Sequence, residues 1–220
     1  MPNDVTQQLS IIGAEAPSII ERIAGNESGV DFNKVIPMPE ELNIEDSSDG
    51  RMGLAAITGQ CGNYLTYPWV KNMGIGTAEE FAAYLERERP KAIDLARKYF
   101  SNQEKFGHTT WWGWCVANWG TKWNAYSVGE PELLSDRTTI RFNTAWLPAL
   151  PVVARLSELF PSVELTLRYF DEGWSFAGEA FFAAGVHVDD CFAPSESDPR
   201  TRIIYREVYG EELPLVDDEE

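Results

Sequence analysis

The most restrictive feature of the sequence is a strict two-residue alternation of apolar and polar side chains after Pro161. The apolar positions are Val163, Leu165, Leu167 and Tyr169, and the polar positions between them are Glu164, Thr166 and Arg168. Because successive side chains of a β-strand point to opposite faces, this pattern predicts a strand with one buried face. The next residues, Asp171-Glu172-Gly173, predict a tight turn into a second strand that carries Trp174, Phe176, Gly178, Ala180 and Phe182. Together they predict an antiparallel hairpin.

Further elements are predicted on the N-terminal side of this hairpin. Apolar patterning predicts strands over residues 5–12, 122–128 and 138–145, and helices that begin at Pro17 and Pro151. Thr77 and Glu80 form a capping box that predicts two consecutive helices, or one kinked helix, over residues 78–100. The element order predicts an α+β fold with a split β-α-β antiparallel sheet and helices on one face. We expect a single domain over residues 1–188, a mainly helical insertion at about 52–118, and an acidic extension over 189–220.

The charge balance limits the kinds of partner. The formal charge is -17, from 35 acidic and 18 basic residues. Such a chain does not coat DNA or anionic lipid, so we expect no membrane and no nucleic acid as direct ligands. The chain has neither a signal-peptide pattern nor an apolar run long enough to span a bilayer, and we expect a cytoplasmic protein. The acidic C-terminus is either a solubility tail or a surface that occupies a basic groove on a partner.

No catalytic or metal motif stands out. The cysteines, Cys61, Cys115 and Cys191, are widely spaced, which predicts reduced thiols rather than disulfides or a Cys-x-x-Cys site. His187, Asp189 and Cys191 alternate and could share a strand face, but acidic residues at a surface strand end are the simpler interpretation. We therefore expect no metal and no cofactor.

The densest feature is the segment 110–126, which contains five of the eight tryptophans. Its tryptophans can form a core, a protein-binding hot spot, or a platform for stacking bases, and the net charge opposes the last. Lys122 lies between Trp119 and Trp123, where a cation among aromatic rings can mark a ligand site or can be an ordinary surface lysine. Asp171 and Glu172 either form the turn or converge with Lys122. The candidate binding residues are Trp111, Trp112, Trp119, Lys122, Trp123, Asp171, Glu172 and Trp174.

Several strings resemble a known family. They are the Met1-Pro2-Asn3 start, the segment from Asp31 to Pro39, Trp119-Gly120-Thr121-Lys122-Trp123-Asn124-Ala125, Phe142-Asn143-Thr144-Ala145-Trp146, Leu167-Arg168-Tyr169-Phe170-Asp171-Glu172-Gly173-Trp174 and Phe176-Ala177-Gly178-Glu179. They resemble the YubB ferredoxin-like family, small proteins of unknown biochemical role carried by phages and plasmids. The resemblance implies a ferredoxin-like fold and a mobile-element origin, and it implies no catalytic residue.

Two functions remain open at this point. The first is a non-enzymatic accessory protein of a mobile element that binds and modulates a host protein, with inhibition of a bacterial defence system as one form of that role. The second is an enzyme or small-ligand-binding protein with a pocket near Lys122 and Asp171. A convergent pocket with a perturbed carboxylate favours the second, and a flat acidic face favours the first.

Overall fold

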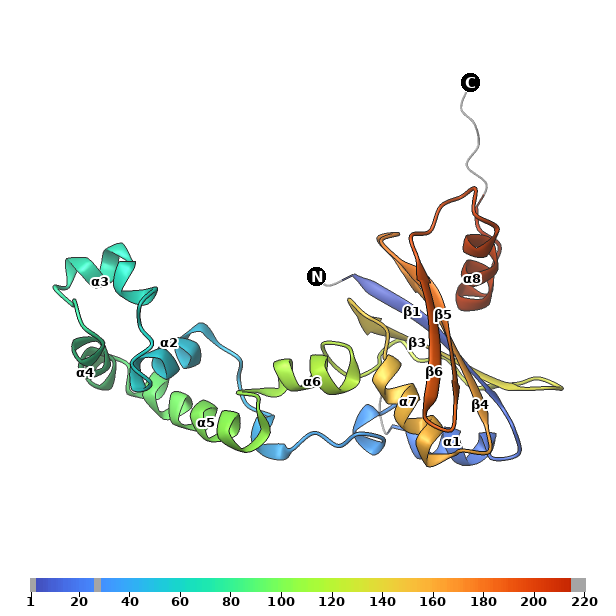
Figure 1. Cartoon of the computed structure of the whole chain (residues 1–220), viewed down its shortest axis with the longest axis horizontal. Coiled ribbons are helices and arrows are strands. Elements are labelled where there is room, and N and C mark those ends of the chain that lie inside the picture. Colours follow the sequence, from blue (N-terminus) through green and yellow to red (C-terminus); the bar gives the residue numbers. More distant parts are fainter. Residues whose placement is uncertain (1–2, 26–28, 215–220) are drawn as a thin grey trace, which may run out of the picture. The chain divides into compact units, whose positions relative to one another are not determined.

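A computed structural model describes residues 3–25 and 29–214, which divide into two compact units. We call residues 1–37 and 115–220 the sheet unit, and residues 38–114 the helical unit. Figure 1 shows the elements in chain order: β1 (Asp4–Ile12), α1 (Ala16–Ile23), α2 (Ser48–Ile57), α3 (Pro68–Asn72), α4 (Ala78–Glu88), α5 (Pro90–Phe106), α6 (Trp111–Trp119), β2 (Glu132–Leu133), β3 (Thr138–Ala145), α7 (Leu150–Leu159), β4 (Glu164–Asp171), β5 (Ala177–Ala183), β6 (Val186–Phe192) and α8 (Pro199–Tyr209). The division between the units falls within α6.

The sheet unit contains a six-stranded sheet in the order β2-β3-β1-β4-β5-β6, and all neighbouring strands are antiparallel. Strand β1 lies between β3 and β4 and is antiparallel to both. Strands β3 and β4 therefore run parallel to each other, and α7 connects them. This is the split β-α-β arrangement, so the predicted α+β class is confirmed.

Two adjacent residues of β1 show that α7 and α8 lie on opposite faces of the sheet. The backbone N–H of Ala149, just before α7, donates to Oε1 of Gln7 at 3.0 Å, whereas Nε2 of Gln8 donates to the carbonyl of Glu207 in α8 at 2.7 Å. Adjacent side chains on a strand point to opposite faces. The expectation that the helices cover only one face is therefore wrong.

The predicted alternation positions the core on the Gln7 face. The sheet register pairs Leu9 of β1 with Ile140 of β3 on one side and with Leu167 of β4 on the other, and all three are buried. Each such side chain contributes roughly 1.5–3 kcal/mol by leaving water. The strands predicted at 5–12, at 138–145 and after Pro161 are confirmed. Their register places the apolar side chains of all three strands on the same face of the sheet.

The helical unit is held by the packing of α2 against α5 and α4, and its buried residues include Met52, Ala56, Val70, Phe81, Leu85 and Ile93. A Cβ on Gly53 would lie 2.4 Å from the carbonyl oxygen of Ala92, so glycine permits the close approach of α2 and α5. The predicted capping box is present: Oγ1 of Thr77 accepts from the N–H of Glu80, whose carboxylate accepts from the N–H of Thr77. Two consecutive helices follow, which is one of the two predicted arrangements.

One predicted strand is wrong. Residues 122–128 form a single bridge, between Tyr126 and Asn143, instead of a strand. The side chain of Asn124 accepts from the N–H of Phe32 at 2.9 Å and donates to Asp31 at 2.7 Å. These bonds tie the segment to the loop after α1 and take the place of a regular ladder.

The C-terminal region also differs from the expectation. Residues expected to form an acidic extension instead complete β6 and form α8, which packs on β4 with Ile204 and Val208 against Phe170. Asp198 caps the N-terminus of helix α8, because its side chain accepts a hydrogen bond from the N–H of Arg200. The acidic residues Asp217, Asp218, Glu219 and Glu220 lie outside the described residues. The helical unit spans 38–114, so it begins earlier than the expected insertion at about 52–118.

Candidate functional site

The eight residues expected to form a site are divided between the units. Trp111 and Trp112 belong to the helical unit, and the other six belong to the sheet unit. Trp119 is part of the core: it is 3% exposed, its indole N–H donates to the carbonyl of Ile36 at 2.9 Å, and its ring meets that of Phe32 edge to face. This tryptophan serves packing rather than binding.

Asp171 organises the turn between β4 and β5. The residue is buried, and its carboxylate accepts from the N–H of Ser175 at 3.0 Å and from Nδ2 of Asn3 at 3.4 Å. Its backbone carbonyl also accepts from the N–H of Trp174 at 2.9 Å. Both carboxylate oxygens therefore have partners within the fold, as expected of an aspartate that shapes a turn.

Lys122 lies between two indoles. Its Nζ is 4.5 Å from the ring centroid of Trp123 and 4.5 Å from that of Trp146. Within residues 3–25 and 29–214, no carboxylate lies within 4.0 Å of this ammonium group. Trp146 was not among the expected site residues, although it follows the strand 138–145 in one of the family-like strings. Each cation–π contact at such a site stabilises by about 0.5–1 kcal/mol.

The start of β1 bonds both to the residue that follows β3 and to the turn that follows β4, which places these two parts of the chain at the same end of the sheet. The carbonyl of Asn3 accepts from the N–H of Trp146 at 3.0 Å, and the carbonyl of Asp4 accepts from the N–H of Glu172 at 3.0 Å. The N–H of Asp4 in turn donates to Oε1 of Glu172 at 2.8 Å. Trp146, with Lys122 and Trp123 beside it, and the turn that carries Trp174 thus lie at the end of the sheet at which β1 begins, and we call these four residues the tryptophan end.

Two of these indoles sit on strained backbone. Trp146 has a φ of 70° and Trp174 a φ of 58°, and they remain 43% and 37% exposed. The left-handed region costs a non-glycine residue about 1–2 kcal/mol, and a bulky residue there is unusual. Such conformations cluster at functional sites. The tryptophan end is therefore the best-supported candidate site of the sheet unit.

A polar cluster adjoins the tryptophan end. The phenol of Tyr126 donates to a carboxylate oxygen of Asp4, and Nδ2 of Asn143 donates to the other carboxylate oxygen at 3.2 Å. Burial, followed by the hydrogen bond and charge of Asp4 and the charge of Glu172, raises the pKa of Tyr126 well above its usual range. The phenol therefore keeps its proton to a higher pH than an ordinary tyrosine and donates its hydrogen bond to Asp4.

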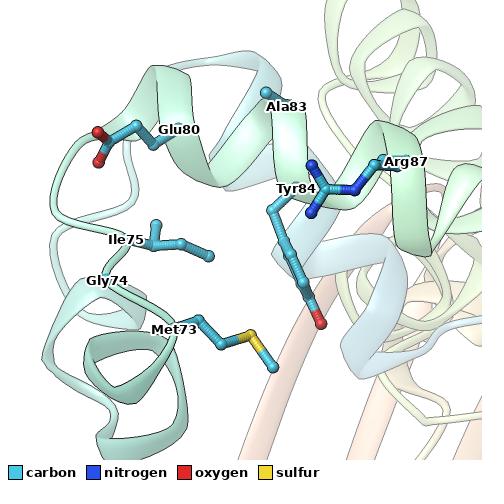
Figure 2. Close-up of a pocket in the computed structure, with 7 residues that line it drawn as sticks. All are labelled: Met73, Gly74, Ile75, Glu80, Ala83, Tyr84 and Arg87. Atoms are coloured by element: carbon cyan, nitrogen blue, oxygen red, sulfur yellow. The ribbon is translucent and has the colours of Figure 1, made fainter.

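The helical unit has a separate hollow of about 540 Å³. Figure 2 shows Tyr84 and Arg87 projecting from α4 toward Met73 and Ile75, which precede the helix. The Arg87 Nε donates to Glu88 at 2.7 Å. Glu80 also lines this hollow, but its carboxylate is used in the capping box. The polar groups at this hollow are thus the Arg87 guanidinium, the Tyr84 phenol and the Glu80 carboxylate.

The described residues set two further limits. Residues 3–25 and 29–214 contain no group of three or more His, Cys, Asp or Glu side chains placed to hold a metal ion. None of the helices that the structure describes is long and apolar enough to cross a bilayer. The three cysteines are free thiols, of which Cys61 and Cys115 are buried and Cys191 is exposed.

Comparison with known proteins gives a structural likeness over most of the chain and a family-model match within the sheet unit. The crystal structure of the protein Api92 from Yersinia pseudotuberculosis is 13% identical over 90% of this chain and 100% of that chain, with a TM-score of 0.46. A search of curated proteins gave no match. Residues 118–210 match a family model described as the ferredoxin-like domain in Api92-like protein. This confirms the expected ferredoxin-like fold, and the segment 118–210 is thereby similar to the ferredoxin-like domain of Api92-like proteins.

Proposed function

We propose that this chain is a non-enzymatic protein-binding protein whose contact surface includes the tryptophan end. The observation that carries the proposal is that Trp146 and Trp174 are both strained and partly exposed. Tryptophan is enriched among the residues that dominate binding energy at protein interfaces. Backbone strain at two such residues is accounted for if exposed indoles are needed there.

The alternative, a small-ligand pocket near Lys122 and Asp171, has less support. The Asp171 carboxylate already accepts two hydrogen bonds from the turn and from Asn3, so it is not free to meet a ligand. Tyr126 keeps its proton to a higher pH than an ordinary tyrosine. Since no carboxylate among residues 3–25 and 29–214 lies within 4.0 Å of the Lys122 ammonium group, the cluster is better suited to contact than to catalysis.

The finer parts of the proposal rest on the sequence. The resemblance to the YubB family supports a mobile-element origin and a bacterial host protein as the partner, with inhibition of a defence system as one form of the role. The charge of -17 supports a partner that is not a nucleic acid or an anionic membrane. We also propose a cytoplasmic location.

The test uses two tryptophans with the same exposed fraction. Trp146 in the sheet unit and Trp112 in the helical unit are each 43% exposed. Tagged wild-type protein, Trp146→Ser and Trp112→Ser are used to capture proteins from a bacterial lysate at moderate and high salt, and the retained protein is then purified for calorimetric titration. We expect one stoichiometric protein whose affinity falls by about tenfold or more with Trp146→Ser and changes little with Trp112→Ser.

Two results would contradict the proposal. If Trp112→Ser abolishes binding and Trp146→Ser does not, the contact surface lies in the helical unit. If no stoichiometric protein is retained, and a small-molecule screen instead finds a ligand whose binding requires Lys122, the ligand-binding alternative replaces it.

A further inference from the structure

Strand β6 is an unprotected edge of the sheet. It is the last strand in the sheet order, and six of its seven residues are exposed, the exception being Phe192. The opposite edge, β2, has only two residues, Glu132–Leu133. Short edge strands are one way in which proteins avoid pairing with other chains, and a long exposed edge presents free N–H and C=O groups for a further strand. Strand β6, with seven residues, is not protected by being short.

An apolar surface adjoins the edge on the open part of the sheet. Ile12, Phe181, Val186 and Val188 are 44%, 50%, 71% and 69% exposed, and we call them the β6 patch. Phe181 of β5 is paired with Val188 of β6. The four residues help to line a hollow of about 470 Å³, which also includes Thr166. A hollow of this size accepts apolar side chains from a neighbouring segment.

The side chains of β6 also indicate the charge of an occupant. Asp189 and Asp190 are both exposed near the middle of the strand. Asp189 accepts from the phenol of Tyr169 at 2.6 Å, and Asp190 lies 3.6 Å from Arg200, which is itself more closely paired with Asp198. A second copy of this chain would bring two such acidic strands together, on proteins of charge -17, and like charges opposite each other destabilise a sheet. A strand with basic side chains is complementary in charge to this acidic edge.

We propose that β6 binds an extended segment of a partner protein as an added strand. The segment alternates apolar side chains, which meet the β6 patch, with lysine or arginine side chains on the opposite face, which meet Asp189. Main-chain hydrogen bonds supply affinity in this mode, and the alternating side chains supply specificity. The inference does not depend on the tryptophan end being a contact surface, since it rests on a different strand and different residues.

The test uses the full chain and three synthetic peptides. The probe is a short peptide of alternating valine and lysine, and the comparison peptides are alternating valine and glutamate, and the probe with a central proline. We expect the probe to bind, to slow amide exchange across Val186–Phe192, and to bind about tenfold more tightly than either comparison peptide. Proline removes a backbone donor from the ladder, and glutamate repels the acidic edge.

A matched pair of variants locates the site. Val188 and Leu133 are exposed apolar residues on opposite edge strands, at 69% and 80%. Val188→Lys should weaken probe binding by about tenfold or more, because it places a cation against the basic segment, and Leu133→Lys should leave it unchanged. The proposal is overturned if the amides of Val186–Phe192 gain no protection, if the proline peptide binds as well as the probe, or if Leu133→Lys weakens binding as much as Val188→Lys. Neither substitution alters a buried residue, so both variants are expected to fold.

Discussion

Replacement of Trp146 by glycine or by alanine should reveal the backbone strain at the tryptophan end. A fully buried tryptophan removes roughly 150–250 Å² from water, and Trp146 is 43% exposed, so loss of its ring forfeits roughly 80–140 Å² of burial. At about 25 cal/mol per Å² this is about 2–3.5 kcal/mol, and loss of the contact with Lys122 adds about 0.5–1 kcal/mol. Both variants should therefore be destabilised by about 3 kcal/mol.

The two variants should differ from each other by a smaller amount. At a φ of 70°, alanine retains the left-handed cost of about 1–2 kcal/mol, whereas glycine does not. Glycine loses about 0.4–1 kcal/mol more than alanine through the entropy of the unfolded chain. Trp146→Gly should therefore be more stable than Trp146→Ala by about 0.5–1 kcal/mol.

The control is the next residue, Leu147, which is 48% exposed and whose φ is not positive. There the order should reverse, with Leu147→Gly less stable than Leu147→Ala by about 0.4–1 kcal/mol. Urea unfolding followed by circular dichroism gives the free energies, and amide exchange at Leu9 and Leu167 reports on the sheet unit alone. If glycine is no more stable than alanine at position 146, the argument from strain fails.

Two further predictions concern buried polar groups of the same unit. Asp171→Ala should lower the free energy of unfolding by about 1–3 kcal/mol, because the N–H of Ser175 loses its acceptor; unchanged stability together with a lost ligand would contradict a structural role for Asp171. Burial and the hydrogen bond to Asp189 raise the pKa of Tyr169 well above its usual range, so the folded state keeps this proton while the unfolded state loses it above about pH 10. Stability should therefore fall as the pH rises above that value, and Tyr169→Phe should fall less steeply in urea titrations over that range.

Some features of both units could be predicted because they depend on local patterns. The alternation from Val163 to Tyr169 needs only one buried face to determine a strand. The capping box at Thr77 and Glu80 likewise predicted a helix start from residues three positions apart. Gly120, with a φ of 79°, follows α6 directly, as glycine often does at a helix C-terminus.

Other features were missed because their signals are weak or distant. The turn between β5 and β6 places Ala184 at a φ of 48° before Gly185 at 81°. An alanine there gives none of the Asn-Gly signal that predicts such a hairpin, so β6 was not expected to continue the sheet. Helix α8 had the Asp-Pro start typical of a helix, but its acidic surroundings led to the expectation of an extension. Residues 122–128 failed as a strand because their hydrogen bonds go to a loop nearly a hundred residues earlier.

The sequence by itself determined the α+β class, the positions of β1, β3 and β4 along the chain and the acidic charge, since these follow from side-chain periodicity and composition. Tertiary structure decided which candidate residues are exposed and which have partners. In the structure Trp119 lies in the core, Asp171 is part of a turn, and Trp146 packs beside Lys122. These outcomes depend on the pairing of β1 with β3 and β4, which brings together Asn3, Trp146 and Asp171 from distant parts of the chain. No local pattern specifies such contacts, because the free energy that favours them comes from burial across the whole sheet.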